Sequence, residues 1–182
     1  MTRTTKPKRV RAFTLPADYA QTRKLRRQRE ATRLAEVGRA ADDGRWVRLA
    51  PRAAAAWRRM QVAAAHDGVE LLALSGFRSV RRQHQLIERK LAAGETLEEI
   101  LRYVAAPGFS EHHTGRALDI GSPEHLELDG NFARTAAFRW LSRRAAEFGF
   151  NLSYPRNNPH GIGYEPWHWC WKSDQMRRVH VD

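Results

Sequence analysis

The chain has 182 residues, of which 42% are hydrophobic and 9% aromatic, and this composition indicates a folded domain rather than a disordered segment. No stretch approaches the roughly 20 consecutive apolar residues of a membrane-spanning helix, so we expect no membrane span. The single cysteine, Cys170, excludes an internal disulfide and a multi-cysteine zinc cluster.

The formal net charge of +12 is concentrated near the start of the chain. Residues 1–30 hold ten Lys and Arg against Asp18 and Glu30, which gives this segment a net charge of +8. Such a segment suits an anionic partner, such as nucleic acid, acidic lipid or an anionic wall polymer, while a solvated, partly helical extension is the simpler interpretation. No apolar run of roughly 7–15 residues follows the basic start, so we expect no signal peptide there.

The first predicted elements are helical. Residues 23–41 are highly charged with a thin apolar stripe, and the segment DDGRW breaks their predicted helix at residues 42–46. We therefore divide the chain into a basic helical N-terminal extension over residues 1–44 and a folded domain over residues 45–182. In that domain Pro51 begins an Ala-rich helix, which ends near Gly68.

The middle of the chain is predicted to form a strand and two helices. The apolar run VELLALS at residues 69–75 indicates a buried strand. Ser79 can cap a helix that ends at Gly94. Thr96 and Glu99 then form a capping-box pattern, which predicts another short helix.

Strands gather in the second half. RALDIG at residues 116–121 predicts a strand, and residues 134–148 predict an amphipathic helix. FNLSY at residues 150–154 and PWHWCW at residues 166–171 predict closing strands. Because helices come first and strands late, we predict an α+β fold: a small single domain with a largely antiparallel sheet packed by helices.

Candidate metal ligands lie in the second half: His112, His113, Asp119, His125, His160, Glu165 and His168. A catalytic zinc site takes three His, Asp or Glu ligands and keeps one position open for water. Asp119 lies in an apolar strand, where a buried carboxylate needs a compensating partner such as a cation. His112 precedes it by a turn at Gly115, so the two are candidates for one site.

Two further segments could supply the remaining chemistry. Glu165 and His168 are three residues apart, a spacing that reaches one site only if Pro166 bends the backbone. A carboxylate beside a zinc-bound water can take its proton and pass it to a leaving amine. Arg78, after the buried strand, could hold a carboxylate or an oxyanion. Each residue alone is also compatible with a structural or solvated position.

Four segments together resemble a known family: SGFRSVRRQ (75–83), PGFSEHHTGRALDIG (107–121), FGFNLSYP (148–155) and GYEPWHW (163–169). In order and spacing they resemble the VanY-type zinc D-alanyl-D-alanine carboxypeptidases, which are related to VanX-type dipeptidases and phage stem-peptide lysins. The family patterns S-G-[YF]-R-S-x-x-x-Q, S-x-H-x-x-G-x-A-x-D and E-x-W-H are complete here. The resemblance covers about residues 50–172 and implies a small α+β domain with a zinc site in a cleft on the sheet.

The resemblance also implies a role for each motif residue. One catalytic Zn²⁺ would be bound by His112, Asp119 and His168. Glu165 would act as the general base, and Arg78 would hold the scissile carbonyl and its oxyanion. Ser110 and Gln83 occupy motif positions linked to substrate binding. His113 and Glu111 are expected to be neighbours of the site rather than metal ligands, with the His113 side chain directed elsewhere.

The implied substrate is a peptidoglycan stem peptide, from which the enzyme would remove the terminal D-Ala. An endopeptidase that cuts within the stem peptide is an alternative on the same metal site. A non-catalytic wall-binding or nucleic-acid-binding module is a second alternative. We expect a monomer, whose basic N-terminus could contact an anionic polymer.

Overall fold

The computed structural model describes residues 13–172, and its centre is a four-stranded antiparallel sheet. The strand order is β3-β4-β6-β5, with β3 at Leu72–Ser75, β4 at Ala117–Gly121, β6 at His168–Trp171 and β5 at Phe150–Leu152. A separate antiparallel hairpin consists of β1 (Ala35–Arg39) and β2 (Trp46–Leu49). The α+β fold with a largely antiparallel sheet is confirmed.

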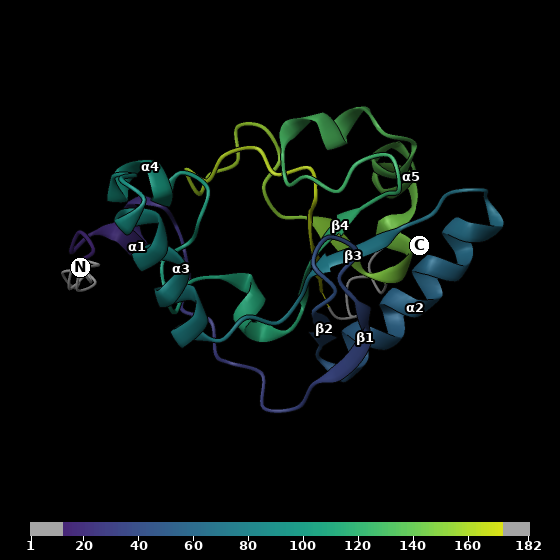
Figure 1. The fold of residues 1–182 in the computed structure, drawn as a ribbon, viewed down its shortest axis with the longest axis horizontal. Helices are drawn as coiled ribbons and strands as arrows, with labels where there is room; N and C mark the ends of the chain where they lie inside the picture. Colours follow the sequence, from purple (N-terminus) through teal and green to yellow (C-terminus); the bar gives the residue numbers. More distant parts are fainter. Residues whose placement is uncertain (1–12, 173–182) are drawn as a thin grey trace, which may run out of the picture.

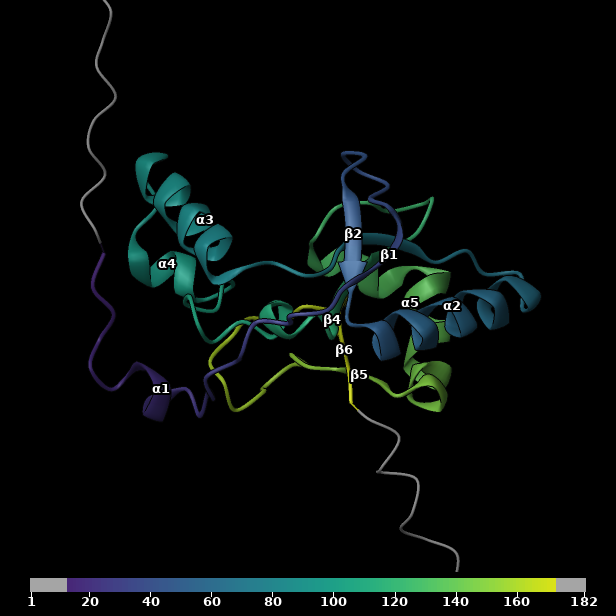
Figure 2. The same cartoon turned by 90° about the horizontal axis from the view of Figure 1, so that it is seen from below.

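The helices form two groups on either side of the strands (Figures 1 and 2). One group contains α2 (Pro51–His66) and α5 (Ala136–Arg144). The other contains the short α1 (Tyr19–Thr22), α3 (Val80–Ala92) and α4 (Leu97–Leu101). Three 3₁₀ helices complete the fold: η1 (Glu111–Thr114), η2 (Gly130–Arg134) and η3 (Ala145–Phe148).

Each group has its own hydrophobic cluster. The larger one joins α2, α5 and the sheet through fully buried side chains such as Trp57, Trp140 and Phe150. The smaller one joins α1, α3 and α4 around Tyr19 and Ile87. Because apolar burial is the main stabilising term, these two clusters fix the positions of the segments that run between them.

Local sequence signals set the helix ends as predicted. Ser79 accepts a hydrogen bond from the Arg82 amide at the start of α3. Thr96 and Glu99 form a complete capping box at the start of α4, which satisfies amides that have no partner within the helix. Gly149 ends η3 with φ at +83°, a conformation that glycine adopts readily.

The helix predicted over residues 23–41 is wrong. Its last part is strand β1, which pairs with β2 from Ala35 opposite Leu49 to Arg39 opposite Trp46. Its first part makes long-range backbone bonds instead: the Gln28 amide donates to Gly108 O at 2.8 Å. Contacts between distant segments therefore replace the internal bonds of a helix.

Residues 13–34 lie against the rest of the chain rather than apart from it. Phe13 stacks on His84 of α3 with ring centroids 4.8 Å apart. The Tyr19 hydroxyl accepts a hydrogen bond from the Ala106 amide, and Tyr19 is buried. Residues 1–12 of the basic extension lie outside the described residues, and the boundary near residue 44 stays a prediction.

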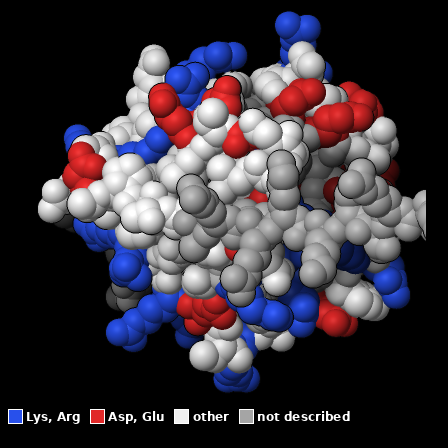
Figure 3. All heavy atoms as spheres, turned by 60° about the vertical axis from the view of Figure 1, so that its left-hand side comes forward, with Lys and Arg blue, Asp and Glu red and all other residues white. Residues whose placement is uncertain are grey.

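Both signs of charge occupy the surface. On the face shown in Figure 3, Lys and Arg predominate in the lower half, and Asp and Glu gather at the upper right. Within residues 13–172, no helix is long and apolar enough to cross a membrane.

Candidate metal centre and cleft

The first motif histidine is fixed by backbone contacts. His112 lies in η1 and is buried. Its Nδ1 lies 2.7 Å from Gly76 O, and because a carbonyl oxygen only accepts, Nδ1 carries the proton. The proton-free Nε2 then faces Asp119, 3.3 Å from its Oδ2. Gly115, which ends η1 with φ at +64°, has no room for a Cβ, which would lie 2.8 Å from the Ala50 nitrogen.

Strand pairing brings the second and third motif residues together. Asp119 on β4 lies directly opposite His168 on β6 in the antiparallel register, so both side chains are on the same face of the sheet. His168 Nδ1 is 3.2 Å from Asp119 Oδ1. One ligand atom from each of His112, Asp119 and His168 lies within 4.8 Å of the others, and all three residues are buried.

The general-base candidate reaches the same place through a turn. Residues 166–167 form a turn, and the His168 amide donates to Glu165 O at 3.1 Å. The bend predicted at Pro166 is therefore present, and it places Glu165 Oε2 3.7 Å from His168 Nδ1. Glu165 is itself buried, at 6% exposure.

Burial and charge shift the pKa values of these groups in opposite directions. Burial raises the pKa of Glu165 to about 8 against the opposing effect of His168. Burial would also raise the pKa of Asp119, but the two histidines outweigh it and lower the value. For His168, burial lowers the pKa, and the hydrogen bonds with Asp119 and Glu111 reverse this and raise it to about 10. The site therefore favours a positive charge between its carboxylates.

The donor set fits a divalent metal. A histidine nitrogen of His112 and one of His168 both face the Asp119 carboxylate at 3.2–3.3 Å. Two lone pairs this close to a negative charge repel it unless a proton or a metal cation lies between them. Two imidazoles and one carboxylate are a common ligand set for catalytic zinc and leave the fourth position open.

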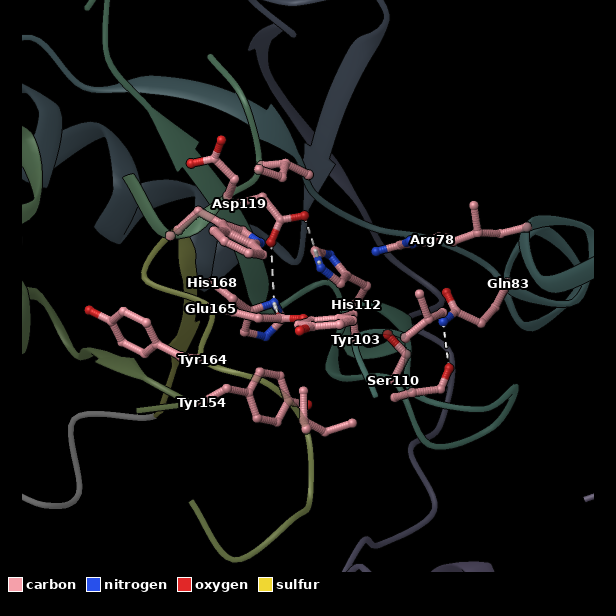
Figure 4. A pocket seen from close by; sticks show the side chains of 18 of the residues that line it. Arg78, Gln83, Tyr103, Ser110, His112, Asp119, Tyr154, Tyr164, Glu165 and His168 are labelled. Carbon is pink, nitrogen blue, oxygen red and sulfur yellow. Dashed lines mark hydrogen bonds and ion pairs between the residues drawn. The ribbon is translucent and has the colours of Figure 1, made fainter. Parts of the chain in front are cut away.

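A cleft of about 790 Å³ runs past these residues (Figure 4). Arg78, Gln83 and Ser110 line it together with the three candidate ligands and Glu165. Among the described residues, two buried polar atoms in this lining have no hydrogen-bond partner: Arg78 Nε and Gln83 Oε1. Gln83 is oriented by its amide nitrogen, which donates to Ala105 O at 2.6 Å. Buried polar atoms are normally paired, so both are candidates for ligand contacts.

Two neighbours of His112 have more defined positions than the sequence predicted. His113 is fully buried: its Nδ1–H donates to Arg78 O at 2.6 Å and its Nε2 accepts from the Gly108 amide at 3.1 Å. Glu111 Oε2 lies 3.0 Å from His168 Nε2. The only sequence signal for either was its place beside His112, which says nothing about the partner across the fold.

The candidate histidines His125 and His160 lie outside the group formed by His112, Asp119 and His168. His125 interacts with Asp129, 3.1 Å from its Oδ1. His160 packs its ring against Tyr154, and its Nδ1 lies 3.1 Å from Arg23 O.

Three solved structures with similar folds are those of enzymes or complexes that concern peptidoglycan, D-Ala-D-Ala or Zn(II). A structure of the LdcB LD-carboxypeptidase, described as revealing peptidoglycan recognition, has a TM-score of 0.73 and 31% identity. The aligned region covers 82% of this chain and 72% of the LdcB chain. VanYB in complex with D-Ala-D-Ala has a TM-score of 0.63 and 28% identity, with 82% and 81% covered. A VanY D,D-pentapeptidase in complex with Zn(II) has a TM-score of 0.62 and 26% identity, with 81% and 82% covered.

Similar sequences point the same way. The Bacillus subtilis protein YodJ is 39% identical over 134 residues, which are 71% of this chain and 48% of YodJ. A D-alanyl-D-alanine carboxypeptidase of Enterococcus faecalis is 32% identical over 117 residues, 59% of this chain and 42% of the relative. The chain thus spans less than half the length of these two relatives. The family model for VanY, D-alanyl-D-alanine carboxypeptidase, matches residues 47–174. The chain therefore belongs to the VanY family of D-alanyl-D-alanine carboxypeptidases.

Proposed function

We propose that this protein is a zinc-dependent metallopeptidase that removes the terminal D-Ala from peptidoglycan stem peptides. The observation that carries the proposal is the buried group of His112, Asp119 and His168 with the carboxylate of Glu165 beside it. Family membership and the zinc and D-Ala-D-Ala complexes of relatives support it.

The three ligands in this proposal are His112 Nε2, an oxygen of Asp119 and His168 Nδ1. Zinc, when bound, lowers the pKa of a coordinated water to about 7 and polarises the scissile carbonyl. The protein holds the donors ready, since Gly76 O orients His112 and the register of β4 and β6 sets Asp119 against His168.

Glu165 is the general base and acid of the proposed reaction. Its carboxylate takes a proton from the attacking water and passes it to the nitrogen of the leaving D-Ala as the peptide C–N bond breaks. In the metal-free protein burial raises the pKa of Glu165 to about 8, and a divalent cation bound beside it would favour the carboxylate form that takes the proton.

Arg78, Gln83 and Ser110 bind the substrate in this proposal. The unpartnered Arg78 Nε donates to the scissile carbonyl oxygen and to the oxyanion that forms from it. The unpartnered Gln83 Oε1 accepts an N–H of the peptide, and the Ser110 hydroxyl lines the same cleft. Burial lowers the pKa of Arg78, while Asp119 and Glu165 support its charged form.

A second candidate is removal of D-Ala from the tetrapeptide stem, an L,D cleavage. The observation that favours it is the fold similarity to an LD-carboxypeptidase, whose TM-score is 0.73. An endopeptidase that cuts within the stem uses the same metal ligands and base, so the cleavage site must be measured. Monomeric state and a contact of the basic N-terminus with anionic polymers stay predictions.

The experiment is digestion of defined stem pentapeptide and tetrapeptide by zinc-loaded protein, with the fragments weighed by mass spectrometry. Free D-Ala from the pentapeptide is the expected result, and free D-Ala from the tetrapeptide alone identifies the L,D enzyme. Internal fragments without free D-Ala overturn both in favour of the endopeptidase.

The same assay tests the role of Glu165. We expect Glu165→Gln to lower kcat by about 10²–10⁴-fold, because the amide cannot take the proton from water. Glu70→Ala is the control, since Glu70 is exposed and lies outside the cleft lining. Unchanged kcat in Glu165→Gln contradicts the mechanism.

A further inference from the structure

The His168 ring lies between two carboxylates. Its Nδ1 is 3.2 Å from Asp119 Oδ1, and its Nε2 is 3.0 Å from Glu111 Oε2. His168 is buried, and the Glu111 side chain retains 23% exposure. The ring is also held between other rings, with centroids 4.8 Å from Tyr154 and 4.9 Å from His112.

An imidazole that binds a metal is neutral and has a single N–H, so only one of the two carboxylates can then accept that proton. If the proton is on Nδ1, it bonds Asp119 and that nitrogen cannot bind a metal. If it is on Nε2, it bonds Glu111, and Nδ1 faces Asp119 with a free lone pair. His112 has no such ambiguity, because its Nδ1 faces the Gly76 carbonyl, which can only accept.

We propose that Glu111 is a positioning residue that accepts the Nε2–H of His168 and thereby holds its Nδ1 ready to bind zinc. This inference rests on the zinc centre of the proposed function. Carboxylates that bond the second nitrogen of a metal-binding histidine fix its tautomer and orientation and strengthen it as a ligand.

Glu111 is not a fourth ligand in this arrangement. Its carboxylate contacts Nε2, whereas Asp119 contacts Nδ1 of the same ring. The buried group whose ligand atoms lie together consists of His112, Asp119 and His168 without Glu111. A metal on Nδ1 is therefore separated from the Glu111 oxygen by the imidazole.

The short helix η1 carries both functions on adjacent residues. Glu111 begins η1 and His112 follows it. The Thr114 hydroxyl donates to Glu111 O at 2.6 Å, which secures the turn. One turn of chain thus presents a ligand to the metal and the acceptor that orients a second ligand 56 residues further along the sequence from the first.

The test is zinc affinity, measured by competition with a chromophoric chelator in the absence of substrate. Glu111→Met keeps the length of the side chain but has no carboxylate, and we expect it to weaken zinc binding by about 10–100-fold. Glu111→Gln keeps one acceptor oxygen, and we expect an affinity between those of Glu111→Met and the wild type. Glu70→Ala is the control for loss of an exposed carboxylate.

The outcomes separate this inference from the proposed reaction. Wild-type zinc affinity in both Glu111 variants overturns the positioning role and leaves the hydrolysis proposal standing. Weakened zinc binding in the Glu111 variants supports the positioning role whatever the reaction is. If the zinc-loaded wild-type protein releases no D-Ala, the proposed reaction is overturned and the positioning role stands. Thermal unfolding of the zinc-free variants checks that they fold. If Glu111→Met does not fold, Glu111→Gln decides: a several-fold loss of affinity supports the role, and unchanged affinity overturns it.

Discussion

Adjacent histidines in this chain hold different parts of the site. His112 faces Asp119, whereas His113 turns away and bridges two backbone segments, the Gly108 amide and the Arg78 carbonyl. These segments belong to two separate motifs. His113 therefore fixes the loop that carries Arg78 relative to the loop that carries His112.

We expect His113→Ala to lower the free energy of unfolding by about 1–3 kcal/mol, because it leaves the buried Gly108 amide and the partly buried Arg78 carbonyl without partners. Urea unfolding followed by circular dichroism measures the change. His66→Ala is the matched control, since the His66 side chain is 90% exposed. Equal stability of the two variants would contradict a structural role for His113.

At the scale of elements, the pairing of β4 with β6 brings two of the three candidate metal ligands together. Asp119 and His168 are 49 residues apart in sequence and lie directly opposite each other in the sheet. The sequence predicted both strands from their apolar runs, and the motifs predicted which residues gather. Register is a property of two strands together, so neither strand alone could predict this contact.

The hairpin β1–β2 was missed for a related reason. Leu25, Leu34 and Val37 are spaced as a thin helical stripe, and Gly38 is a local signal against a helix that this stripe hides. In the fold, Val37 packs on the large cluster from a strand whose register shifts between Glu36 and Gly38. Tertiary contacts outweigh such a weak local preference.

Helices α2 and α5 are joined by a polar contact at the end of α2. Asp67 accepts hydrogen bonds from Trp140 Nε1 at 2.7 Å and Arg144 Nη1 at 2.6 Å, both on α5. These two bonds lower the pKa of Asp67 from 3.8. A carboxyl with a lower pKa in the folded state stabilises the protein above pH 3.8, and the effect is lost as pH falls through the folded value.

We therefore expect Asp67→Asn to lower the melting temperature at pH 7 and to approach the wild type in acid. Thermal unfolding between pH 7 and about pH 2, a range that extends well below 3.8, measures the difference at each pH. Asp18→Asn is the control, because Asp18 is exposed. A difference between Asp67→Asn and the wild type that stays constant over this range would contradict the linkage.

At the scale of the whole molecule, the segment before β1 ties together two parts of the cleft. Arg23 donates to Leu101 O at the end of α4 and to Gly161 O in the loop before Glu165, at 2.6 and 3.1 Å. The Gly163 amide also donates to Arg102 O at 2.6 Å. Residues 13–34 therefore contribute to the shape of the site, although the family motifs begin beyond them.

The last prediction concerns this connection. We expect Arg23→Ala to lower the free energy of unfolding by about 1–2 kcal/mol, because two carbonyls lose a charged donor. We also expect KM to rise more than kcat falls, since the loop of Gly161 leads to cleft-lining residues but Arg23 is not in the cleft lining. Urea unfolding and steady-state kinetics measure the two effects. Arg26→Ala removes the same charge from an exposed position and is the matched control. If both variants behave alike, the basic charge of the segment rather than the Arg23 contacts is what matters.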